Sequence, residues 1–174
     1  MNRNVEIKAR LSEPARQREI AAGLADGPLE PIEQEDTFFR VPEGRLKLRD
    51  LGGGRGELIA YDRSDSAGPA ESRYAVVPTA DPAALRDLLA SVLPVRGVVR
   101  KRRDLYRIGR TRVHLDRVEG LGDYLELEVV LEPGEPRERG EAIALDLVRK
   151  LEIDDADRVD VAYIDLLEER EDPA

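Results

Sequence analysis

Residues 4–11 read Asn-Val-Glu-Ile-Lys-Ala-Arg-Leu, and polar and apolar side chains alternate along this stretch without a break. An alternation with a period of two predicts a strand whose apolar members share one face. The opposite face would carry Glu6, Lys8 and Arg10. The chain is therefore expected to open with a strand that is apolar on one side and charged on the other.

The lysines fall in other segments of the same kind. Only four of the 28 basic residues are lysines, and Lys8, Lys47 and Lys101 lie at alternating positions of charged, strand-like segments. Lysine is a compact point charge and arginine is a planar fork, so the two are not interchangeable around phosphate oxygens. In a chain that otherwise uses arginine, this placement indicates a binding site.

Turn residues and further alternation predict the remaining elements. Strands are expected within 30–41 and at 45–49, 57–63, 72–77, 98–108, 111–118 and 124–132, with a polar loop at 62–71. Ser12 and Asp81 are the expected N-caps of two helices, and amphipathic helices are expected at 139–151 and 157–169. The pattern favours one α+β domain, residues 1–170, with an antiparallel sheet and a disordered tail at 171–174.

Composition excludes several kinds of partner and chemistry. The net charge of -9 argues against binding to nucleic acid or to an acidic membrane surface. Without cysteine there is no disulfide or thiolate chemistry, and with His114 as the single histidine we expect no histidine-based triad or zinc site. No apolar run is long enough to span a membrane and the N-terminus has no hydrophobic signal core, so we expect a cytoplasmic protein.

The polar faces of the expected strands are sorted by charge. Basic side chains dominate 45–49 and 101–103, whereas Glu126 and Glu128 make one face of 124–132 acidic. A solvated face would explain any single strand. Like charges on neighbouring strands repel, so the sorted set favours a ligand that bridges both signs. A polyphosphate with Mg²⁺ or Mn²⁺ fits, because basic side chains bind phosphate oxygens and carboxylates bind hard cations.

Seven segments, in order along nearly the whole chain, carry a family resemblance. They are 4–8 (NVEIK), 34–39 (QEDTFF), 45–49 (RLKLR), 57–63 (ELIAYDR), 101–103 (KRR), 118–128 (VEGLGDYLELE) and 163–167 (YIDLL). In these segments the chain resembles the CYTH superfamily, which includes class IV adenylyl cyclases, thiamine triphosphatases and related triphosphate tunnel metalloenzymes. The match rests on the ordered set, since no single segment is specific.

The resemblance implies a fold and a site. The implied fold is a closed eight-stranded antiparallel β-barrel, with a charged tunnel inside and helices packed outside. The residues that would bind the triphosphate are Lys8, Lys47, Arg49, Arg63, Arg73, Lys101 and Arg103, with Lys8 and Arg63 as candidate catalytic residues. The residues that would hold Mg²⁺ or Mn²⁺ are Glu6, Asp116, Glu126 and Glu128.

Two positions depart from the family pattern. Asn4 stands where the opening Glu-x-Glu-x-Lys pattern has its first glutamate, which removes one carboxylate from the metal site. Phe38 stands where many relatives have tyrosine, which removes a hydroxyl. Phosphate binding should survive both changes. The kind and the rate of the catalysed reaction depend more strongly on the missing carboxylate and hydroxyl.

Three functions remain open at this point. The resemblance favours a class IV adenylyl cyclase, which converts ATP to cyclic AMP and pyrophosphate. A phosphohydrolase acting on thiamine triphosphate, a nucleoside triphosphate or inorganic tripolyphosphate would use the same cradle. A non-catalytic sensor of triphosphates or organic phosphates is the third alternative. For the oligomeric state, the resemblance implies a homodimer.

Overall fold

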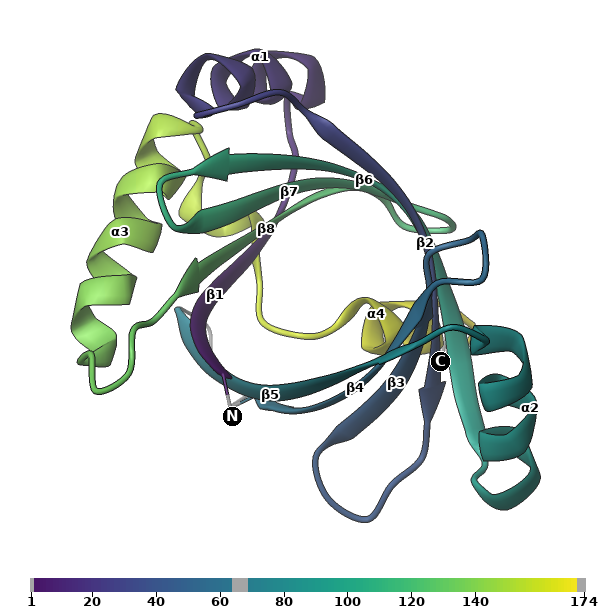
Figure 1. The fold of residues 1–174 in the computed structure, drawn as a ribbon. Helices are drawn as coiled ribbons and strands as arrows, with labels where there is room; N and C mark the ends of the chain where they lie inside the picture. Colours follow the sequence, from purple (N-terminus) through teal and green to yellow (C-terminus); the bar gives the residue numbers. More distant parts are fainter. Residues whose placement is uncertain (1, 64–68, 172–174) are drawn as a thin grey trace.

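The computed structural model describes residues 2–63 and 69–171, and eight of its strands close into an antiparallel barrel (Figure 1). Residues 64–68 of the predicted loop lie outside the described residues, as do 172–174 of the predicted tail. The barrel strands are β1 (Asn2–Arg10), β2 (Glu30–Phe39), β3 (Arg45–Asp50), β4 (Gly56–Arg63), β5 (Ala70–Thr79), β6 (Val95–Ile108), β7 (Thr111–Val118) and β8 (Gly122–Val130).

Strand β1 closes the barrel because it pairs on both of its edges. Its residues pair with β8, where Glu6 lies opposite Glu128, and with β5, where Asn4 lies opposite Ser72. The remaining order is β5-β4-β3-β2-β6-β7-β8, and every pairing is antiparallel. The short strand β9 (Arg158–Val159) adds to β1 near Lys8. The prediction of a closed eight-stranded antiparallel barrel is confirmed.

The main apolar core lies outside the barrel. The apolar alternation of 4–11 places Val5 and Ile7 on the outer face of β1, where they are buried with residues of β7 and β8. Helix α3 (Arg137–Lys150) covers this face and contributes Ala144, Leu147 and Val148. Helix α1 (Pro14–Leu24) adds Ala21 at one edge (Figure 1). Because the outer face supplies the core, the inner face is left to polar residues.

A second apolar cluster holds the C-terminal helix α4 (Tyr163–Glu171) against one end of the barrel. Tyr163 and Ile164 pack with Tyr124 of β8 and Phe38 of β2. The ring of Tyr163 meets that of Tyr124 edge to face, with centroids 5.2 Å apart, a favoured aromatic geometry. Figure 1 shows α4 lying across the barrel opening.

Several helix and strand limits differ from the sequence prediction, most of them by two or three residues. The N-cap of α1 is Glu13 rather than Ser12, and Pro14 occupies the first helical position. Residues 157–162 are not α-helical, because the three-residue 3₁₀ helix Asp155–Asp157 and β9 precede α4. Strand β2 begins at Glu30, where the sequence prediction expected an irregular segment before the strand.

The other N-cap prediction is confirmed. Asp81 caps α2 (Pro82–Val92), where its side chain accepts a hydrogen bond from the backbone N–H of Ala84 at 3.0 Å. Proline at the first helical position costs nothing there, because its missing N–H would have no partner within the helix. Among the described residues, none of the helices is both long and apolar enough to span a membrane.

Candidate functional site

The barrel encloses a cavity of about 340 Å³, and side chains from all eight strands line it. The inward positions are the polar members of the alternating strands, as on β1, where Asn4, Glu6 and Lys8 face inside. Among the described side chains, seven basic residues line the cavity: Lys8, Arg45, Lys47, Arg49, Lys101, Arg103 and Arg112. The acidic residues that line it are Glu6, Asp36, Glu57, Glu126 and Glu128.

Arg103 is the centre of one ion-pair cluster. Its guanidinium donates to both oxygens of Asp116, at 2.7 and 2.6 Å, and also to Glu126. Asp116 is completely buried and accepts a further hydrogen bond from the hydroxyl of Tyr163 at 3.0 Å. A bidentate guanidinium–carboxylate pair fixes both groups in one geometry. Asp116 therefore holds Arg103 in place from behind the cavity wall.

Two lysines share the same region near α4. Lys101 Nζ lies 3.5 Å from Asp116 and 3.7 Å from Glu126, and Lys8 Nζ lies 3.2 Å from Glu126. Both ammonium groups also face the ring of Tyr163, at 4.2 Å for Lys8 and 4.9 Å for Lys101. Cation–π contact and carboxylates together stabilise these buried charges. The α4 end of the cavity therefore holds a compact cluster of paired cations and carboxylates.

Asp36 organises the opposite wall. Its buried carboxylate accepts hydrogen bonds from Lys47 at 3.0 Å and from Arg49 at 2.9 and 3.2 Å. Asp36 faces Arg49 across the β2–β3 pairing, so the register of the sheet brings the two together. Burial raises the pKa of Asp36, but Arg49, Lys47 and Lys101 outweigh it and hold that pKa far below its usual range.

The carboxylates of the other wall are held ionised in the same way. Burial raises the pKa of Glu126, but Lys101, Lys8 and Arg103 outweigh it and hold that pKa well below its ordinary value. For Glu128, burial is outweighed by His114, Arg112 and Arg103, which lower its pKa to about 2. Both carboxylates are therefore ionised at neutral pH, which is the form that binds a cation.

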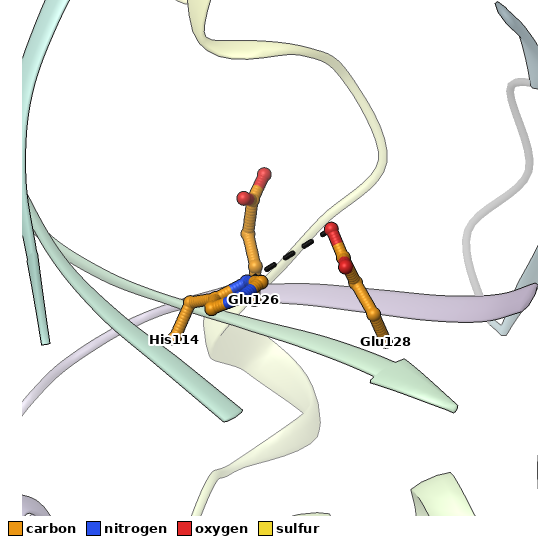
Figure 2. A group of neighbouring side chains, drawn as sticks. All are labelled: His114, Glu126 and Glu128. Carbon is orange, nitrogen blue, oxygen red and sulfur yellow. Dashed lines mark ion pairs between the residues drawn. The ribbon is translucent and has the colours of Figure 1, made fainter. Parts of the chain in front are cut away.

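A nitrogen donor lies beside these carboxylates. One ligand atom each from His114, Glu126 and Glu128 lies within 4.8 Å of the others, and Figure 2 shows the imidazole close to both carboxylates. His114 Nδ1 lies 3.9 Å from a Glu128 oxygen, is buried, and has no hydrogen-bond partner. Imidazole nitrogen and carboxylate oxygen are ligand types that divalent metal ions use in proteins. The residues present therefore fit a metal ion.

The structure brings most of the predicted site residues together. The cavity is lined by Glu6, Lys8, Lys47, Arg49, Lys101, Arg103, Glu126 and Glu128. What each does toward a ligand stays a prediction. The side chain of Arg63 lies outside the part of the chain that is described, although its backbone ends β4.

Two predicted site residues lie elsewhere. The Arg73 side chain is 66% exposed on the outer face and pairs with Glu71 at 3.3 Å, so the prediction that it joins the basic cradle is corrected. On β5 the inward residues are its neighbours Ser72 and Tyr74. Asp116 is buried behind the wall, where Arg103 and Tyr163 occupy its oxygens, and the geometry assigns it a positioning role rather than metal binding.

The sequence prediction left several residues of the site out. Arg45 and Arg112 line the cavity, and the alternation of their strands places them on the same face as Lys47 and His114. Asp36 could be found in the same way, one position from Phe38 along the inward face. Tyr163 could not be found from strand periodicity, because it comes from α4.

The chain was compared with protein families and solved structures. A model of the CYTH domain matches residues 2–163. The PH1012 protein of Pyrococcus horikoshii is 28% identical, with a TM-score of 0.84 over 94% of this chain and 98% of that one. No curated protein matches the chain.

Two further structures share the fold at lower identity. A proposed adenylate cyclase from Vibrio parahaemolyticus is 19% identical, with a TM-score of 0.75 over 95% of this chain and 97% of that one. A proposed adenylyl cyclase from Hippeastrum, described as having a dominant triphosphatase activity, is 18% identical. Its TM-score is 0.67 over 97% of this chain and 95% of that one.

Proposed function

Because the chain belongs to the CYTH domain family, an enzymatic family that binds triphosphate substrates and depends on metal, we propose that its barrel binds a triphosphate and hydrolyses it. The observation that carries this proposal is the convergence of basic side chains from β1, β3, β6 and β7 on one enclosed cavity. Phosphate oxygens are the acceptors that such a set of ammonium and guanidinium donors suits.

The charge balance of the cavity supports a role for metal. The basic lining residues already face nearly as many carboxylates, and Lys47, Arg49 and Arg103 each have an acidic partner. A highly charged triphosphate would add negative charge to an interior that is almost neutral. A divalent cation bound at Glu126, Glu128 and Glu6 would supply charge neutralisation at the phosphates.

The basic residues would bind and orient the substrate. Phosphoryl transfer passes through a loose transition state with charge spread over the outer oxygens, so positioning and charge stabilisation do most of the work. Arg103 and Lys101 are fixed by Asp116 and Tyr163, which keeps these donors oriented before the substrate arrives. Such preorganisation avoids rearrangement during the reaction.

The cavity volume favours hydrolysis over cyclisation. At about 340 Å³ the cavity lies near the lower end of ligand sites, which span roughly 300–1,000 Å³. A triphosphate chain suits this size, whereas a cyclase must also hold the ribose hydroxyl against the α-phosphate. Cyclisation of ATP is the second candidate, supported by three apolar lining residues at the end away from α4: Ile32, Leu51 and Leu105. These could contact an organic group outside the charged zone.

Replacing Lys47 with alanine should weaken tripolyphosphate binding about ten- to hundredfold, because one charged hydrogen bond is worth roughly 1.5–3 kcal/mol. Isothermal titration calorimetry would measure the change. Arg117→Ala is the matched control, since Arg117 is 69% exposed on the outside and should not alter binding. Equal affinity of Lys47→Ala and the unaltered protein would show that this wall does not contact the ligand.

Phosphorus NMR of the products separates the candidate reactions. The protein is incubated with Mg²⁺ or Mn²⁺ and, separately, with tripolyphosphate, thiamine triphosphate and ATP. We expect orthophosphate to appear, as hydrolysis of the terminal phosphate requires. Pyrophosphate with cyclic AMP would replace this proposal by cyclisation, and bound but unchanged substrate would identify a sensor.

A further inference from the structure

His114 is the one histidine of the chain and lies inside the barrel, at the middle of β7. The sheet register places it directly opposite Glu126 on β8 and opposite Leu105 on β6. Its side chain is only 5% exposed, yet its Nδ1 atom has no hydrogen-bond partner. A buried polar atom without a partner is costly, commonly about 1–3 kcal/mol, so this nitrogen calls for an explanation.

A carboxylate oxygen of Glu128 lies close to Nδ1. Its Oε1 lies 3.9 Å from Nδ1, while its Oε2 is bound to Arg112 at 2.7 Å. Metal–ligand bonds of roughly 2.0–2.2 Å place neighbouring ligand atoms about 3–3.5 Å apart in a tetrahedral site. A small adjustment of these two side chains would therefore bring them to the separation that one shared cation needs.

We propose that His114 Nδ1 is a metal ligand together with Glu128 and Glu126, so that this barrel selects Zn²⁺ or Co²⁺ over Mg²⁺. Imidazole nitrogen suits late first-row metals, whereas an all-oxygen site suits Mg²⁺. The proposal rests on the proposed function in one respect, namely that a divalent cation binds inside the barrel. It goes further by replacing the expected all-carboxylate site with a mixed nitrogen and oxygen site.

The state of the imidazole agrees with this assignment. Burial, with Arg103 nearby, lowers the pKa of His114 to about 3, so the ring is neutral at physiological pH. A neutral ring can coordinate without first losing a proton. Glu128 would be the main anionic partner, because both oxygens of Glu126 are already engaged by Lys8 and by Arg103 with Lys101. The metal must compete with those cations for Glu126.

The single histidine permits a direct test. Protein labelled with ¹⁵N-histidine and freed of metal by a chelator gives one pair of imidazole nitrogen resonances. Addition of Zn²⁺ should shift the Nδ1 resonance, whereas Mg²⁺ at the same concentration should leave it unchanged. Calorimetry should show that His114→Gln weakens Zn²⁺ binding at least about tenfold, which is the smallest loss typical even of outer-shell partners.

Two further variants sharpen the result. Thr111→Val changes a buried residue of the same strand that does not line the cavity, and it should bind Zn²⁺ like the unaltered protein. Glu128→Gln should lose Zn²⁺ affinity as His114→Gln does.

Two outcomes would overturn the proposal. Zn²⁺ binding with unchanged imidazole resonances would exclude coordination by His114, and absence of any metal binding would exclude the site. Tripolyphosphate titration of the same samples tests the proposed function separately, since it reports triphosphate binding whether or not His114 holds metal.

Discussion

Replacing Arg103 with alanine should destabilise the protein by about 3 kcal/mol, because breaking a buried ion pair leaves an uncompensated charge. The guanidinium is the bidentate partner of Asp116 and also binds Glu126, and all three groups are at least largely buried. Without it, the nearest ammonium to Asp116 is Lys101 at 3.5 Å, and the nearest to Glu126 is Lys8 at 3.2 Å. One ammonium cannot replace five guanidinium donors. Urea unfolding at pH 7 would measure the loss.

Arg102→Ala is the matched control for this measurement. Arg102 precedes Arg103 in β6, but its side chain is 66% exposed on the outer face, and its carboxylate partner Glu33 is also exposed. Exposed pairs of this kind contribute roughly 0–1 kcal/mol. Arg103→Lys should fall between the two variants, since it keeps the charge and loses the fork. Equal stability of Arg103→Ala and Arg102→Ala would refute the central role of the buried cluster.

The metal-free protein should lose stability steadily as the pH falls from 6.5 toward 3, because His114 resists protonation in the fold. The unfolded chain binds a proton near pH 6.5, whereas the folded protein does so at about pH 3. Stability from this group is therefore fully present above pH 6.5 and is lost as the pH falls toward the folded pKa. The expected slope is about 1.4 kcal/mol per pH unit, on the order of 4 kcal/mol in total.

Urea unfolding in a chelator at pH 6.5 and pH 4.5 would measure this slope. Comparison with a His114 variant isolates this residue, because carboxylates with a depressed folded pKa, such as Glu128 at about 2, also begin to lose stability near their unfolded pKa of about 4.3. His114→Gln, which cannot be protonated, should show a shallower loss of stability in this interval than the unaltered protein. The same slope in both proteins would mean that the fold does not lower the pKa of His114.

The accuracy of the sequence prediction differs between strands for a physical reason. Strand β1 alternates strictly, so the side chains that face the cavity could be identified in advance. Strand β5 does not, because Tyr74, Ala75, Val76 and Val77 are consecutive and none of the four is charged. Without alternation the face of each residue cannot be assigned from the sequence, and the prediction that Arg73 faces the cavity is wrong.

Contacts between distant segments could not be predicted from periodicity. Asp116 shares the inward polar pattern of β7, and only the contact with Tyr163 of α4 shows that its carboxylate is sealed behind the wall. The role of His114 was discounted because zinc sites usually combine several histidines or cysteines. The sheet register supplies the missing ligands by placing Glu126 opposite it and Glu128 two residues further along β8.

The location of the apolar core outside the barrel has a consequence for redesign. Along β1, Ile7 is packed beneath α3 while its neighbour Lys8 points into the cavity, so folding and recognition depend on different residues of one strand. An engineer could rewrite the ligand preference of the interior without repacking the core. Most of the interior cations are paired with a carboxylate, so a basic residue and its acidic partner must be substituted together. Asp36 and Lys47, which form one such ion pair, are the first two to replace.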